Sequence, residues 1–376
     1  MNYLAWINEA HGVPDEGDAS PLYLKAFKLL KGSSSQDSRR VDVDRLLRDN
    51  AEALSMLREA SGKPACFFRF VPRLDEFVER PFGEPSIQHR FRQAFDLFRQ
   101  RVRANLKAGD VEAAMQDVTV LLAITHHRFG QPSAMDYLEA VNGAQLTYRL
   151  LREVVADLEN AEQASTLLTM INRYRSPGPE ALHLEIELAK AFHRLQYHLK
   201  DSDGDGKCDV WVFVNDRIPL DKPVAFTDAV QEVVDRYERW RKIVALPVTR
   251  EGTSRSTAFA EELDRTERAF DEFSFPRVDG LIPIRVETLA MQRGVCLAAA
   301  LAYHRLKEGK WAASLDDVTR YVPGMSTIDP HGGGEPFRLA ERSGGLVLYS
   351  VGLNGVDDGG REDAHGKGDL ILWESR

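Results

Sequence analysis

The chain has 376 residues, of which 43% are hydrophobic and 28% are charged, as in an ordinary globular protein with about two or three cores. Its formal net charge of −9 argues against a nucleic-acid partner, because phosphate binding requires a basic surface. The three cysteines, Cys66, Cys208 and Cys296, are widely separated and odd in number, which predicts neither a disulfide framework nor a cysteine zinc site. No apolar run approaches the roughly 20 residues of a membrane span.

Residues 1–200 are predicted to form a helical domain of antiparallel pairs. Apolar residues recur there at spacings of three and four, and short polar or proline turns separate the segments. After a weakly helical stretch (3–30), the predicted helices are 43–60, 91–107, 111–126, 135–158, 161–174 and 179–199.

One predicted helical pair has a distinctive turn, Ala-Asn-Leu-Lys-Ala-Gly-Asp-Val-Glu-Ala-Ala at 104–114. This turn resembles that of a tetratricopeptide-type hairpin, in which Gly109 permits the reversal and small alanines let the helices approach closely. A single hairpin is not an array, because a solenoid needs about three repeats.

Residues 201–222 are predicted to be an Asp-rich turn followed by a short strand. The turn reads Asp-Ser-Asp-Gly-Asp-Gly-Lys-Cys-Asp and reproduces the front of an EF-hand calcium loop, with Gly206 at the sharp bend. The back of the loop departs from the EF-hand, because Val212 replaces the bidentate Glu and the residues that follow alternate like a strand. The predicted calcium ligands are Asp201, Asp203, Asp205, the carbonyl of Lys207, and Asp209. The alternative is a solvated turn between a helix and a strand.

Two further units follow. Residues 223–275 are predicted to add helices 226–243 and 257–270, which pack on the helical domain and are separated by a polar linker at 247–256. Residues 276–376 are predicted to form a small α+β domain, with a long helix at 282–306 and a hairpin of strands 337–340 and 346–351.

The last unit carries a series of short motifs. They are Asp329-Pro330, Pro336-Phe337, Tyr349-Ser350-Val351-Gly352, Asn354-Gly355 and Glu362-Asp363-Ala364, followed by Asp369 and Trp373. The series resembles the C-terminal half of a type II secretion major pseudopilin, a family in which a helix leads into a short β-meander whose last loop binds one calcium ion. The local sequence agrees, because a loop of Gly, Asn and Asp has no core to hold it and is suited to a hard cation.

The resemblance implies a set of tail ligands. These are the carboxylates of Asp363 and Asp369, the side chain of Asn354, and the carbonyls of Val351 and Val356. Asn354 stands where the family usually has Asp, and residues 365–368 are an insertion between the two aspartates.

Most of the chain, including Asn50-Ala-Glu-Ala-Leu54, also resembles helical proteins of planctomycete-type bacteria that end in the same tail. Such proteins often begin with a membrane anchor, so the native form is expected to be anchored although this chain carries no anchor.

The fold class expected is therefore mainly α, with antiparallel helical pairs, a tetratricopeptide-like hairpin and a C-terminal pseudopilin-like α+β domain. The expected function is that of a noncatalytic extracytoplasmic protein, in the periplasm or cell envelope, which holds one or two Ca²⁺ ions and acts through protein–protein contact. The alternative is a hydrolase whose site lies in the helical domain, without a Gly-x-Ser-x-Gly or His-Glu-x-x-His motif. A deep polar pocket with converging His and carboxylate side chains would favour that alternative.

Overall fold

The structure is a computed structural model that describes residues 3–31, 42–69, 87–131, 134–174, 184–213, 216–246, 248–264, 281–342, 345–362 and 368–375. These residues are mostly helical, as the sequence predicts, with two small antiparallel sheets. The helices are α1 (Tyr3–His11), the 3-10 turn η1 (Asp15–Gly17), α2 (Ser20–Leu29), α3 (Val43–Asp49), α4 (Ala51–Ser61), α5 (Ile87–Lys107), α6 (Val111–Phe129), α7 (Ala134–Ala156), α8 (Ala161–Arg173), α9 (Leu184–His198), α10 (Phe226–Val244), α11 (Arg250–Asp264), α13 (Leu281–Glu308) and α14 (Asp316–Thr319). The strands are β1 (Leu199–Lys200), β2 (Cys208–Phe213), β3 (Asp216–Val224), β4 (Arg338–Arg342), β5 (Gly345–Ser350) and β6 (Leu370–Glu374).

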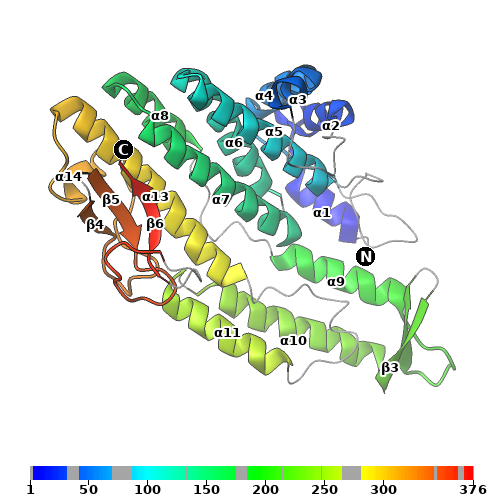
Figure 1. Ribbon diagram of the computed structural model, residues 1–376. Helices are drawn as coiled ribbons and strands as arrows, with labels where there is room; N and C mark the ends of the chain where they lie inside the picture. The colour runs from blue at the N-terminus through cyan, green and yellow to red at the C-terminus, as the bar shows by residue number, and fades with distance from the viewer. Residues whose placement is uncertain are drawn as a thin grey trace.

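Helices α5, α6, α7 and α13 lie side by side (Figure 1), and each packs on the next. The sheet β1-β2-β3 lies at the end of α9, and the sheet β4-β5-β6 lies against α13. Among the described residues, no helix has an apolar stretch long enough to cross a bilayer.

The turn between α5 and α6 reverses the chain as predicted. Gly109 has a φ of 76°, a left-handed conformation that glycine adopts without steric cost. Asp110 caps α6 by accepting a hydrogen bond from the Ala113 amide at 2.9 Å. The likeness of this hairpin to a tetratricopeptide repeat stays a prediction.

Two element boundaries differ from the prediction. The predicted helix 43–60 is divided at the buried Asn50, whose side chain bonds the amide and carbonyl of Lys31 and the carbonyl of Leu46, and so competes with the helical backbone. The predicted linker 247–256 is wrong over most of its length, because α11 begins at Arg250. Threonine hydroxyls in α11 donate hydrogen bonds to backbone carbonyls one turn earlier; for example, Thr257 donates to the carbonyl of Thr253. Residues 265–270 of the predicted helix 257–270 lie outside the described ranges.

Helix α13 joins the two parts of the chain. It packs against α7 and α8 and also against β5 and β6. A Cβ atom on Gly294 would lie 2.6 Å from Leu372 Cδ1, so glycine permits the close approach of β6 to α13. The hairpin β4–β5 occurs where the sequence predicts its two strands, and β6 pairs with β5. One hydrophobic core runs from Ala19 to Trp373.

Candidate calcium sites and an acidic cavity

The Asp-rich turn is anchored at both ends, because β1 and β2 pair antiparallel with Leu199 opposite Trp211. Gly204 and Gly206 have φ values of 81° and 87°, which gives the turn the tight curl that the spacing predicts. β3, which pairs with β2, was not predicted.

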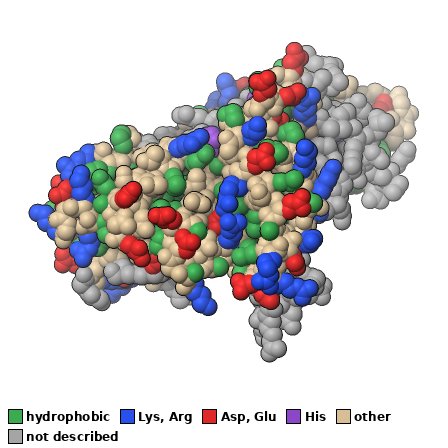
Figure 2. Space-filling model, turned by 90° about the horizontal axis from the view of Figure 1, so that it is seen from above, with side chains coloured by type: hydrophobic (Ala, Val, Ile, Leu, Met, Phe, Trp, Pro, Cys, Tyr) green, Lys and Arg blue, Asp and Glu red, His purple; other side chains and the backbone are tan. Residues whose placement is uncertain are grey.

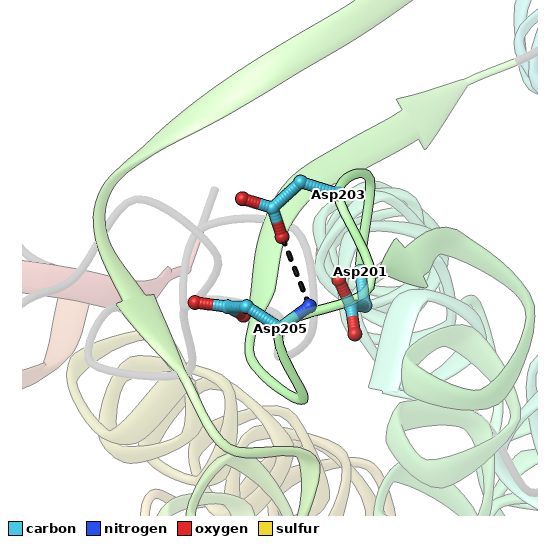
Figure 3. A group of neighbouring side chains, drawn as sticks. All are labelled: Asp201, Asp203 and Asp205. Carbon is cyan, nitrogen blue, oxygen red and sulfur yellow. Dashed lines mark hydrogen bonds between the residues drawn. The ribbon is translucent and has the colours of Figure 1, made fainter.

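Three carboxylates of this turn lie close together. One oxygen each from Asp201, Asp203 and Asp205 lies within 4.8 Å of the others, and all three residues are exposed (Figure 3). Backbone amides hold them in place. Asp201 accepts from the amides of Gly204 at 2.7 Å and Gly206 at 2.9 Å, and Asp203 accepts from the amide of Asp205 at 3.2 Å. The three carboxylates thus form a compact cluster of hard oxygen donors.

The other two predicted ligands of the turn lie differently. Asp209 accepts hydrogen bonds from the amide of Ser202 at 2.8 Å and from its hydroxyl at 2.5 Å, so this carboxylate closes the base of the turn. The exposed Lys207 donates its amide to Asp205 at 2.8 Å. Three of the five predicted ligands are therefore gathered at one point.

The predicted tail ligands are less closely grouped. Asp369 is 2% exposed, and its Oδ2 accepts from the amides of Gly360 at 2.6 Å and Arg361 at 3.3 Å, whereas its Oδ1 has no hydrogen-bond partner in the described part of the chain. Asn354 accepts from the amide of Val356 at 2.9 Å and donates to Asp358 at 3.1 Å, both within its own loop. Asp363 lies outside the described residues.

Asp329 links the motif Asp329-Pro330 to the end of β5. Its buried carboxylate accepts from the amide of His331 at 2.9 Å, the hydroxyl of Ser350 at 2.8 Å and the amide of Val351 at 3.0 Å. The predicted ligand Val351 is thereby fixed at the point where the tail loop begins.

A cavity of about 210 Å³ lies beside these loops. It is lined by Glu287 of α13, His331, Gly352, Leu353, Glu362, Gly368, Asp369 and Leu370. His331 and Asp369 are buried, Glu287 is half-buried, and Glu362 and Leu353 are exposed. Burial lowers the pKa of His331 below its ordinary value, so this imidazole is neutral at pH 7. The sequence did not identify Glu287, His331 or Glu362 as site residues. Glu287 and His331 belong to none of the motifs, and Glu362 was part of the motif Glu362-Asp363-Ala364 but not one of the ligands that the resemblance implies.

The described lining of this cavity includes no Ser, Thr or Cys, so it offers His331 no hydroxyl or thiol to activate as a nucleophile. A second cavity of about 290 Å³ between α5, α6 and α7 is lined by Phe91, Phe95, the buried Arg128 and others, and its described lining also includes no such nucleophile. The first cavity does bring His331 together with the carboxylates of Glu287, Glu362 and Asp369, but it lies against α13 and not within residues 1–200, where the hydrolase alternative places its site.

Comparison with protein-family models, with curated proteins and with solved structures finds no match to this chain.

Proposed function

We propose that this protein is a noncatalytic, calcium-stabilised extracytoplasmic protein that is related to secretion pseudopilins and acts through contact with another protein. The observation that carries the proposal is the cluster of Asp201, Asp203 and Asp205, with oxygens from all three within 4.8 Å of one another. Like charges at this separation repel, and a divalent cation between them removes the repulsion.

The exposure of this turn supports the proposed location. Three protein carboxylates leave several of the six to eight positions around Ca²⁺ to water or backbone oxygens, and Val212 stands in place of a bidentate Glu. Such a site belongs with extracellular calcium modules, whose dissociation constants are about 10⁻⁴ to 10⁻³ M. It fills where calcium is millimolar, as in the periplasm or cell envelope.

Calorimetry on the full chain tests the turn. We expect Asp203→Ala to weaken calcium binding about tenfold or more, because it removes a charged ligand. Asp316→Ala, which removes an exposed carboxylate outside the turn, is the matched control. Calcium should also slow hydrogen exchange across residues 199–213 in the parent protein. Equal exchange there in EDTA and in saturating calcium would refute the turn site.

The tail loop is the second part of the calcium proposal, through Asn354, Asp363, Asp369 and the carbonyls of Val351 and Val356. The supporting observation is Asp369 Oδ1, a buried carboxylate oxygen without a hydrogen-bond partner.

Asn354→Asp tests the tail loop. Without calcium, this substitution replaces the hydrogen bond from Asn354 to Asp358 with repulsion between two carboxylates. With calcium, the new carboxylate supplies a charged ligand. The melting temperature should therefore rise more on calcium addition in Asn354→Asp than in the parent. A calcium response that is unchanged in Asp369→Ala would contradict a tail site.

The surface is consistent with a protein partner. Acidic and basic side chains are interspersed over the described part of the face in Figure 2, and the net charge of −9 disfavours nucleic acid. Exposed large hydrophobic side chains are few in the described ranges, and three of the five, Ile328, Leu353 and Val356, lie on the loops around the acidic cavity. These loops are the proposed contact region.

A further inference from the structure

Two of the residues that line the acidic cavity have a buried polar atom without a hydrogen-bond partner in the described part of the chain. These atoms are Asp369 Oδ1 and His331 Nδ1, and each residue is only 2% exposed. Buried polar atoms are normally paired, because an unpaired one costs roughly 1–3 kcal/mol. Both residues line the cavity, so a ligand in it can pair both atoms.

The charge of the lining selects a cationic ligand. Glu287, Glu362 and Asp369 are acidic, and the described part of the lining includes no Lys or Arg. Two arginines lie close by. Arg152 donates to the carbonyl of Ile371 on β6 and interacts electrostatically with Glu362. Arg250, whose guanidinium lies against Gly355, is near enough to His331 to add to the lowering of its pKa that burial causes. A positive group in the cavity meets the negative charges of Glu287 and Asp369, with Glu362 and the neutral imidazole of His331 beside them.

The geometry distinguishes between kinds of cation. Within the described ranges, the three-ligand clusters tight enough to hold a metal ion include no residue of this cavity, so a calcium ion at Asp369 depends on Asp363, which lies outside those ranges. A guanidinium prefers a bidentate carboxylate, but Asp369 offers only Oδ1, because its Oδ2 accepts from Gly360 and Arg361. An ammonium group has three separate donors, which suit Asp369 Oδ1, His331 Nδ1 and a carboxylate nearer the mouth.

The apolar part of the cavity suits an aliphatic stem. Leu353 and Leu370 line it, and methylene groups pack on such side chains while the charged head reaches polar partners. At about 210 Å³ the cavity is smaller than the roughly 300–1,000 Å³ of pockets for drug-sized ligands, and so fits a single side chain. The exposed Ile328, Leu353 and Val356 provide apolar surface for residues beside that side chain.

We propose that this cavity receives a lysine side chain of a partner protein, with its ammonium group between Asp369, His331 and the carboxylates of Glu287 and Glu362. This assignment rests on one part of the proposed function, namely that the protein acts through contact with another protein, and it does not depend on calcium binding. Calcium bound through Asp369 Oδ1 would compete with the lysine, so binding is measured in EDTA.

The test uses the full chain and two capped peptides, acetyl-Leu-Ala-Lys-Ala-Leu-amide and the same peptide with norleucine in place of lysine. Norleucine keeps the aliphatic stem and removes the ammonium group. We expect saturable binding of the lysine peptide, shifts of the Leu353 and Leu370 methyl resonances, and competition by n-butylammonium. The norleucine peptide should bind about tenfold more weakly or worse. Equal binding of both peptides would overturn the proposal.

Variants separate this site from a general charge effect. Glu287→Gln should weaken the lysine peptide about three- to tenfold, whereas Glu308→Gln, an exposed position at the end of the same helix, should leave it unchanged. Asp369→Asn should weaken it about tenfold or more. Unchanged affinity in both Glu287→Gln and Asp369→Asn would overturn the assignment. It would also be overturned if copies of this chain associate and n-butylammonium dissociates them, because the lysine would then come from a second copy and not from a partner protein.

The outcome is separable from the calcium proposal. Asp203→Ala should weaken calcium binding at the Asp-rich turn and leave lysine-peptide binding intact. Lysine binding in a protein that takes no calcium would refute only the calcium proposal, and calcium binding without peptide discrimination would refute only this one.

Discussion

Asp329 is predicted to hold the C-terminal loops together, and Asp329→Ala tests this. The variant leaves the amides of His331 and Val351 and the hydroxyl of Ser350 without their acceptor. Each buried donor left unpaired costs roughly 1–3 kcal/mol, and removal of a buried charge offsets part of the sum. We expect a loss of about 4 kcal/mol, which is large for a point substitution. Asp329→Asn keeps one acceptor oxygen and should lose about 1–3 kcal/mol.

Hydrogen exchange followed by mass spectrometry measures this loss locally. A loss of 4 kcal/mol corresponds to exchange roughly a thousandfold faster across β5 and residues 351–362. Asp358→Ala, which removes an exposed carboxylate from the same loop, is the control and should change stability by less than about 0.5 kcal/mol. If Asp329→Ala exchanges no faster than Asp358→Ala, the three hydrogen bonds do not hold these loops.

Two further predictions concern the helical part and α13. His127 donates from Nε2 to the carbonyl of Lys63 and accepts at Nδ1 from the Tyr23 hydroxyl, and burial lowers its pKa from 6.5 to about 4. Between pH 4 and 6.5 the unfolded chain therefore binds more protons than the folded protein does. The free energy of unfolding should fall by up to about 3 kcal/mol as the pH drops from 6.5 to 4. The midpoints of urea unfolding, measured across this range, should depend less on pH in His127→Gln than in the parent. Gly294→Ala should destabilise by about 1–3 kcal/mol because its Cβ would overlap Leu372. Thermal unfolding should show a smaller penalty for Gly294→Ala in a Leu372→Ala background than in the parent, because that background removes two of the three overlapping atoms.

The Asp-rich turn was predictable because its information is local. Alternate aspartates around two glycines specify a curled loop within nine residues, and Asp201, Asp203 and Asp205 do gather there. Asp209 was expected at the same point, but Ser202 offers it both an amide and a hydroxyl. A neighbouring donor of this kind competes with a ligand role, and the spacing of acidic residues does not reveal it.

The acidic cavity could not have been predicted in the same way. Glu287 comes from α13, His331 from the loop before β4, and Asp369 from the residue before β6, so only packing of the sheet on the helix unites them. From the sequence alone, Glu287 cannot be distinguished from other charged residues on a helix, and His331 cannot be distinguished from other loop residues. Their common environment depends on Gly294, which lets β6 approach α13 closely enough for the tail loop to reach the helix.

The tail loop has a source of order that its sequence did not suggest. A Gly- and Asp-rich loop without a core was expected to need a cation, but its carboxylates accept backbone amides instead. Asp357 accepts from the amide of Gly359 and the Tyr349 hydroxyl, and Asp369 accepts from Gly360 and Arg361. Each such bond offsets part of the entropy of ordering the chain, so these bonds help to order residues 351–361 before any ion binds. A cation at Asp369 would therefore be bound mainly by Oδ1, the carboxylate oxygen that accepts no hydrogen bond from these amides.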